Sequence, residues 1–122
     1  MKHADFENYL NYLIDTHIKG KMCSKSKEYA RGDDKLYNFK KSAQQDGITP
    51  AEALRGMDLK HRTSITDMLD DLLKDVTHPQ EMWEEKITDH VNYMFLLLAL
   101  LAEEYGWNYV QPADWGNKIE NP

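Results

Sequence analysis

The sequence EKITDHVNYMFLLLALLAEEYG, residues 85–106, decides the fold of this chain. Its first half mixes acidic and apolar side chains, whereas residues 93–102 are apolar on every side of a helix. This run has about half of the roughly 20 residues that a transmembrane helix needs. A helix that is apolar all round has to be covered all round by other helices or by another subunit. We therefore predict a buried helix over residues 79–105 and a homo-oligomer that forms at or near it.

Three further helices are predicted from apolar residues that recur at helical spacing. The first covers residues 5–30 and has a weak point at Gly20, and a short helix follows over residues 35–45. The third covers residues 50–75 and begins with a capping box, Thr49 to Glu52, that has proline at its first helical position. No segment alternates as a strand does. The sequence therefore predicts an all-α four-helix bundle with three long helices and one short helix.

The bundle is predicted to form one domain over residues 1–106, as expected for a chain of 122 residues. Residues 107–122 form a tail without helical periodicity, which contains Trp107 and Trp115. Exposing two indole rings to water is unfavourable. We expect this aromatic tail to pack on the bundle or on a neighbouring subunit.

The composition is typical of a soluble globular chain, with 30% charged and 41% hydrophobic residues. Cys23 is the only cysteine, which excludes an intrachain disulfide and indicates a reducing compartment. The first residues lack the apolar core of a signal peptide. We expect a soluble protein in the cytoplasm, without a membrane partner.

The charge is unevenly distributed along the chain. The net charge is −6, yet residues 19–41 hold eight Lys or Arg and three Asp or Glu, a balance of +5 against −11 for the rest. An acidic protein is poorly suited to bind a nucleic-acid polymer, because the phosphates repel its surface. A local basic segment suits a small anion such as a nucleotide. The alternative interpretation is a helix end that carries lysines for solubility.

Candidate ligand-binding residues occur first within this basic segment. Lys25 and Tyr29 continue the inward stripe of the first helix, and Glu28 is a candidate partner for the lysine. Asn38 precedes Phe39, which we expect to be buried. Such an amide commonly bonds a helix end and sometimes a ligand.

A second set of candidates, Lys60, His61 and Arg62, lies in the third predicted helix. His61 falls on the apolar stripe, where a histidine is more often a satisfied core residue than a catalyst. Lys60 and Arg62 flank the stripe and can reach an anion at its edge. These three residues join Lys25, Glu28, Tyr29 and Asn38 as predicted ligand-binding residues.

Glu85 and Asp89 are the candidate metal ligands. They lie four residues apart and so share one face of a helix, and paired carboxylates suit Mg²⁺. The alternative interpretation is a solvated acidic helix start that is stabilised by the helix dipole, although Asp89 lies in the third turn. No motif identifies catalytic residues, because the sequence lacks a phosphate-binding glycine loop, a dinucleotide fingerprint, HExxH and GxSxG.

Four motifs in combination resemble a group of small phage and prophage proteins near the nucleotide-modification-associated domains. The motifs are Lys25-x-x-Glu28-Tyr29, Asn38-Phe39, Lys60-His61 with Ser64-Ile65, and Ile87-x-Asp89-x-x-Asn92-Tyr93. The resemblance covers residues 20–104. This group is in turn distantly similar to the all-α nucleotide pyrophosphatases of the MazG type, whose EExxE and ExxD motifs hold magnesium against a triphosphate. In this chain Lys86 stands at the ExxD glutamate position, and no EExxE occurs in residues 50–75.

The resemblance implies a phage-type protein of the host cytoplasm that binds a nucleotide or a related phosphorylated molecule. Three functions remain open. The first is a magnesium-dependent nucleotide pyrophosphohydrolase. The second is a non-catalytic protein that sequesters a signalling nucleotide of host defence. The third possibility is a structural or protein-interaction module.

Overall fold

The computed structural model describes residues 1–24 and 33–109, and this part of the chain is helical and contains no strand. Its elements are α1 (His3–Leu13), the π-helix η1 (Ile14–Lys19), α2 (Gly20–Ser24), α4 (Tyr37–Asp46), α5 (Pro50–Leu73) and α6 (Gln80–Tyr105). Because α1, η1 and α2 follow one another without a break, they form one long helical segment. The predicted all-α fold of three long segments and one short helix is confirmed. No helix in the described residues has the length and apolar character needed to cross a membrane.

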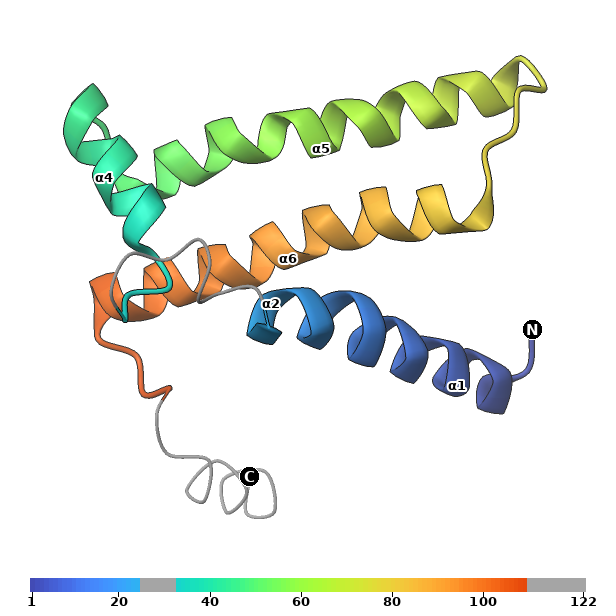
Figure 1. Ribbon diagram of the computed structural model, residues 1–122, viewed down its shortest axis with the longest axis horizontal. Helices are drawn as coiled ribbons and strands as arrows, with labels where there is room; N and C mark the ends of the chain where they lie inside the picture. The colour runs from blue at the N-terminus through green and yellow to red at the C-terminus, as the bar shows by residue number, and fades with distance from the viewer. Residues whose placement is uncertain (25–32, 110–122) are drawn as a thin grey trace.

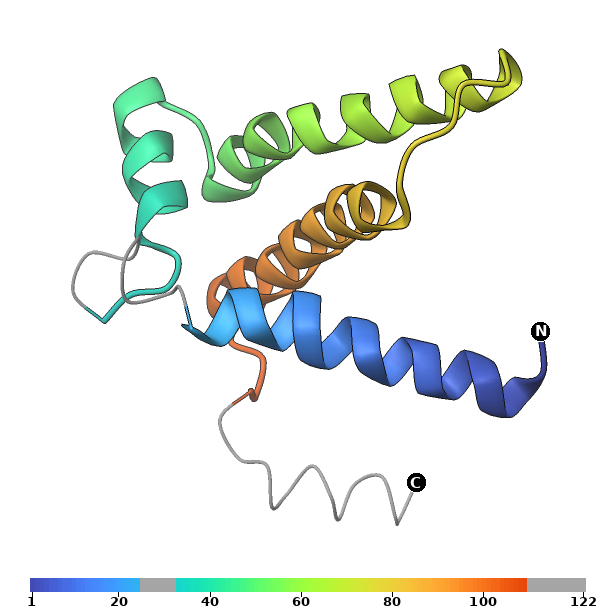
Figure 2. The same cartoon turned by 45° about the vertical axis from the view of Figure 1, so that its right-hand side comes forward.

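Helix α6 lies in the middle of the structure (Figure 1). Helix α5 runs back along one side of it, and the α1–α2 segment lies along the other side (Figure 2). The main contacts of α6 are therefore with α5 and with η1, and α4 packs on α5. This arrangement is an open bundle, in which two helical segments cover opposite sides of a third.

The apolar core lies where α4, the start of α5 and the end of α6 meet. Its buried side chains are Leu36, Phe39, Leu54 and Leu100, and Tyr93 packs against them. Leu54 is only 1% exposed. The predicted burial of Phe39 is confirmed. Burial of each such side chain stabilises the fold by about 1.5–3 kcal/mol.

The helix ends follow from local sequence. The Thr49 hydroxyl oxygen accepts a hydrogen bond from the backbone N–H of Glu52 at 3.2 Å, and Pro50 occupies the first helical position. Gly47 and Gly106 end α4 and α6 with φ of 67° and 68°, in the left-handed region that glycine adopts without strain. These ends agree with the predicted ones to within about two residues.

The weak point predicted at Gly20 coincides with the end of the π-helix η1. Its backbone N–H donates to the carbonyl oxygen of Asp15, five residues earlier. Such a wide turn changes the rotation of the helix and hence the direction of the side chains that follow. As a result, His17 and Lys21 both contact α6. Two predicted regions, residues 25–30 of the first helix and residues 110–122 of the tail, lie outside the described residues.

Candidate functional site

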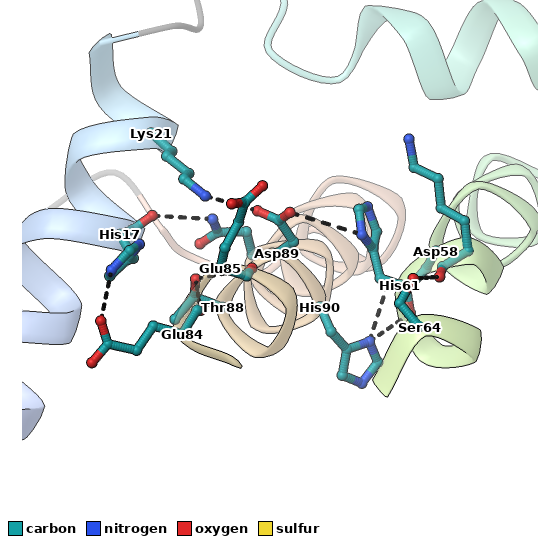
Figure 3. A network of polar contacts seen from close by, with 12 residues as sticks. His17, Lys21, Asp58, His61, Ser64, Glu84, Glu85, Thr88, Asp89 and His90 are labelled. Carbon is teal, nitrogen blue, oxygen red and sulfur yellow. Dashed lines mark hydrogen bonds and ion pairs between the residues drawn. The ribbon is translucent and has the colours of Figure 1, made fainter. Parts of the chain in front are cut away.

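The side of α6 that faces η1 is polar, although it is buried. Glu84, Thr88 and Asn92 follow one another at a spacing of four residues and are 6%, 4% and 6% exposed. Figure 3 shows Glu84 and Thr88 on the side of α6 that faces His17. Sequence reasoning missed this polar row. Polar residues that recur every fourth position on a largely apolar helix are the signal that could have identified it.

Glu84 accepts hydrogen bonds from three side chains. The donors are the hydroxyl groups of Tyr9 at 2.5 Å and Tyr12 at 3.2 Å, and the Gln80 amide at 2.9 Å. The His17 ring nitrogen Nε2 lies 3.5 Å away. The Tyr9 hydrogen bond, followed by that of Gln80, lowers the pKa of Glu84 from its usual value. Glu84 therefore joins the start of the chain to α6 as a hydrogen-bonded carboxylate.

The rest of the polar row bonds to backbone. The Thr88 hydroxyl donates to the carbonyl oxygen of Glu84 at 2.6 Å, within the same helix. The Asn92 amide nitrogen donates to the carbonyl oxygen of His17 at 3.3 Å and so crosses to η1. The other Asn92 side-chain atom, Oδ1, is buried and accepts no hydrogen bond from the described residues.

Asp89 lies at the point where α2, α5 and α6 come together. Its Oδ1 atom is 3.1 Å from the Lys21 Nζ atom, and its Oδ2 atom is 3.9 Å from the His61 Nδ1 atom. Figure 3 shows the Asp89 carboxylate between these two side chains. The structure thus brings together two predicted residues, His61 and Asp89, and adds Lys21, which the sequence did not identify.

His61 is largely buried, with 13% of its side chain exposed. Its ring packs against the Tyr93 ring at a centroid distance of 5.0 Å. Burial lowers the pKa of His61; Asp89 opposes this shift, whereas Lys60 adds to it. The ring is therefore mainly neutral at pH 7, and its contact with Asp89 is polar rather than ionic. We refer to Lys21, His61, Asp89 and Tyr93 as the Asp89 cluster.

A second polar cluster centres on Asp58, which is 1% exposed. Its two oxygens lie 2.8 and 3.1 Å from the His90 Nδ1 atom, and the Arg62 Nε atom is 3.6 Å away. Arg62 also donates to the carbonyl oxygen of Arg55 at 3.4 Å. Arg62, predicted to contact an anionic ligand, thus lies beside a buried carboxylate of its own helix.

The remaining predicted residues are spread over the structure. Lys60 is exposed and precedes His61 in α5. Asn38 is also exposed, and it lies on α4, which contributes no residue to the Asp89 cluster. Lys25, Glu28 and Tyr29 lie outside the described residues. The residues on either side of that segment are described. The Lys35 Nζ atom, after the segment, donates to the carbonyl oxygen of Met22, before it, at 2.7 Å. The chain therefore leaves α2 and returns to its end.

Glu85, the other candidate metal ligand, is exposed on α6, one turn before Asp89. It lines a groove of about 460 Å³ between η1 and α6, together with Lys21 and Glu84. Within residues 1–24 and 33–109, no group of three or more His, Cys, Asp or Glu side chains could hold a metal ion. Magnesium binding by Glu85 and Asp89 stays a prediction.

Comparison with known proteins gave no match: no family model fits the chain, and neither a curated protein nor a solved structure matches it. The resemblance to phage proteins and to MazG-type enzymes therefore stays a prediction as well. The function has to be argued from the residues of the site.

Proposed function

We propose that this protein binds a small phosphorylated molecule, a nucleotide first of all, at the Asp89 cluster. The observation that supports this most is the convergence of Lys21, His61 and Asp89 from three different helices. A half-buried lysine that is fixed by a carboxylate presents its ammonium group in one direction. Phosphate oxygens are a natural partner for such a group, since charge-assisted hydrogen bonds are stronger than neutral ones.

The charge around the cluster favours an anion. Besides burial, Lys60 and Lys86 lower the pKa of His61, while Asp89 and Asp58 oppose this shift. Positive charges other than that of Lys21 therefore act near this site, on a chain whose net charge is −6. Opposite charge concentrated in this way attracts an anion and fixes its orientation.

The aromatic rings add a surface for a base. His61 and Tyr93 pack together with an angle of 46° between their planes, and Tyr93 in turn contacts Phe39 edge to face. A neutral imidazole beside a phenol suits stacking with a flat heterocycle. Lysines for phosphate and rings for a base are the two features that a nucleotide requires.

The described flanks of the basic segment lie near the end of α2. Helix α2 ends at Ser24, three residues after Lys21, and the bond between Lys35 and Met22 returns the chain to that end. Residues 25–32 hold Lys25 and two further basic residues. Lys25, Glu28 and Tyr29 are therefore retained in the proposed ligand-binding set.

Hydrolysis and sequestration are the two versions of this proposal. For hydrolysis, Glu85 and Asp89 would hold Mg²⁺, whose carboxylate ligands they match in type, and the ion would neutralise phosphate charge. Sequestration without turnover is favoured by the ion pair between Lys21 and Asp89. The Lys21 ammonium group lies 3.1 Å from the Asp89 carboxylate and so takes the place that Mg²⁺ would need for hydrolysis. In this version Asp89 positions Lys21 for the ligand.

Isothermal titration calorimetry with ATP and with a cyclic dinucleotide tests the proposal, with Mg²⁺ and with EDTA. Lys21→Met should weaken binding by about tenfold or more, since a hydrogen bond to a charged group contributes about 1.5–3 kcal/mol. Lys19→Met is the matched control, because Lys19 is exposed and lies 3.9 Å from Asp15 on its own helical segment. Equal losses of affinity in both variants would indicate unspecific electrostatic attraction. If the wild type binds neither nucleotide, the ligand-binding proposal is wrong, and a structural or protein-interaction module remains as the function.

Two further measurements separate the versions. Release of phosphate or pyrophosphate only with Mg²⁺, and its loss in Asp89→Asn, would support hydrolysis; binding in EDTA without release would support sequestration. The NMR titration of His61 reports the site directly. A bound phosphate should raise the lowered pKa of this ring, whereas a ligand bound elsewhere should leave it unchanged.

A further inference from the structure

Helix α6 carries a regular apolar row on a side that the described residues leave open. Six residues follow one another at alternating spacings of four and three, the pattern of a coiled-coil seam. They are Ile87, Val91, Met94, Leu98, Leu101 and Tyr105. Four of them are exposed: Ile87 at 43%, Met94 at 37%, Leu98 at 53% and Tyr105 at 66%. We call this row the α6 seam; it is about 27 Å long.

The position of the seam follows from helix geometry. Successive residues turn by 100°, which places Leu98 on the side of α6 opposite Asp89. The buried row from Glu84 to Asn92 faces η1, and His90 contacts Asp58 of α5. The seam therefore lies on a third side of α6, away from the residues that contact η1 and Asp58.

We propose that the α6 seam pairs with the seam of a second copy of this chain, antiparallel and across a two-fold axis. This register matches every seam residue with another one. Ile87 lies against the partner's Tyr105, Val91 against the partner's Leu101, and Met94 against the partner's Leu98. Such a self-complementary contact forms a closed dimer in which every seam residue has a partner.

The flanking residues favour the antiparallel orientation. In this register His90 lies beside the partner's Glu104, which is a favourable pair, and Phe95, 48% exposed, lies beside the partner's Phe95 at the two-fold axis. A parallel pair would instead place the acidic first turns of both α6 helices, with Glu81 and Glu85, at the same end. Antiparallel helices also align their dipoles favourably.

The area is sufficient for a dimer. A large apolar side chain exposes about 200 Å² when fully accessible, so the four exposed seam residues and Phe95 offer about 500 Å² in each copy. Two copies then bury about 1,000 Å² from these residues alone. The half-buried Val91 and Leu101 add to this, which approaches the 1,200–2,000 Å² of specific interfaces. The seam also contains no charged residue, as the centre of an interface requires.

Light scattering coupled to size-exclusion chromatography tests the proposal on the full chain at about 50 μM. The expected mass is twice the 14.3 kDa of one chain. Leu98→Asp should give the single-chain mass, and Leu59→Asp is the matched control, because Leu59 is an equally exposed leucine, at 55%, on α5. Circular dichroism of each variant checks that the helices persist. A wild-type monomer, or loss of the dimer in Leu59→Asp but not in Leu98→Asp, overturns the proposal.

Cross-linking tests the orientation independently of any disruptive variant. In a Cys23→Ser background, Met94→Cys mixed with Leu98→Cys should form a disulfide between the two variants, whereas each variant alone should not. Cross-linking of each variant with itself would show a parallel pair and overturn the antiparallel register. No cross-link in any sample would overturn the pairing of the two seams.

Discussion

Replacing Asp58 with alanine tests how α5 is held on α6. The Asp58 carboxylate is almost fully buried and accepts from His90 at 2.8 and 3.1 Å, with Arg62 at 3.6 Å. Asp58→Ala removes the acceptor and leaves both partners in place. Breaking a fully buried ion pair costs about 3–5 kcal/mol, because the remaining charge has no partner.

The loss should be smaller here, since the partners reach water. The side chains of His90 and Arg62 are 29% and 44% exposed, so each can be hydrated after the substitution. What is lost is the hydrogen bonding to a charged group, about 1.5–3 kcal/mol. We expect Asp58→Ala to lower the free energy of unfolding by about 2 kcal/mol. Asp58→Asn keeps the volume and one acceptor and should cost about 1 kcal/mol less than the alanine variant.

Urea denaturation followed by circular dichroism at one fixed protein concentration measures these losses. With a typical slope of about 1–2 kcal/mol per molar urea, the midpoint of Asp58→Ala should fall by about 1–2 M. Asp67→Ala, at an exposed position of α5, is the control and should stay within about 0.5 kcal/mol of the wild type. The reasoning is refuted if Asp58→Ala and Asp67→Ala unfold at the same urea concentration.

Two further predictions concern the polar row and a helix end. Because the pKa of Glu84 is lower in the folded chain than in the unfolded one, its stabilisation is present above the unfolded value and is lost as the pH falls through the folded value. Thermal denaturation between pH 6 and pH 3 should show this loss in the wild type, a smaller loss in Tyr9→Phe and little in Glu84→Gln; equal pH profiles would contradict it. Thr49→Ala removes the N-cap of α5 and should cost about 1 kcal/mol in urea denaturation, whereas Thr66→Ala, in the exposed middle of the helix, should cost clearly less.

Helix α6 shows why one element determines so much of this protein. Three of its sides have different roles: Glu84 contacts α1 and η1, Asp89 contacts α2 and α5, and Leu98 lies on the open seam. The proposed ligand site and the proposed dimer seam lie on opposite sides of the helix. Variants of one can therefore be tested without touching the other.

The sequence by itself determined the helices and their ends. Apolar spacing and the residues Thr49, Gly47 and Gly106 act over a few positions, so their effects can be derived without knowing the fold. The same local reasoning correctly buried Phe39 and placed His61 on an inward stripe.

Only the tertiary structure decided which polar groups meet. Lys21 and Asp89 are 68 residues apart in the chain, and Tyr9 and Glu84 are 75 apart. Periodicity indicates which side of a helix faces inward, but the choice of partner depends on how two helices cross and on the rotation that η1 introduces. For that reason the sequence could propose Asp89 as a site residue, while the lysine that holds it became visible only when α2, α5 and α6 were placed together.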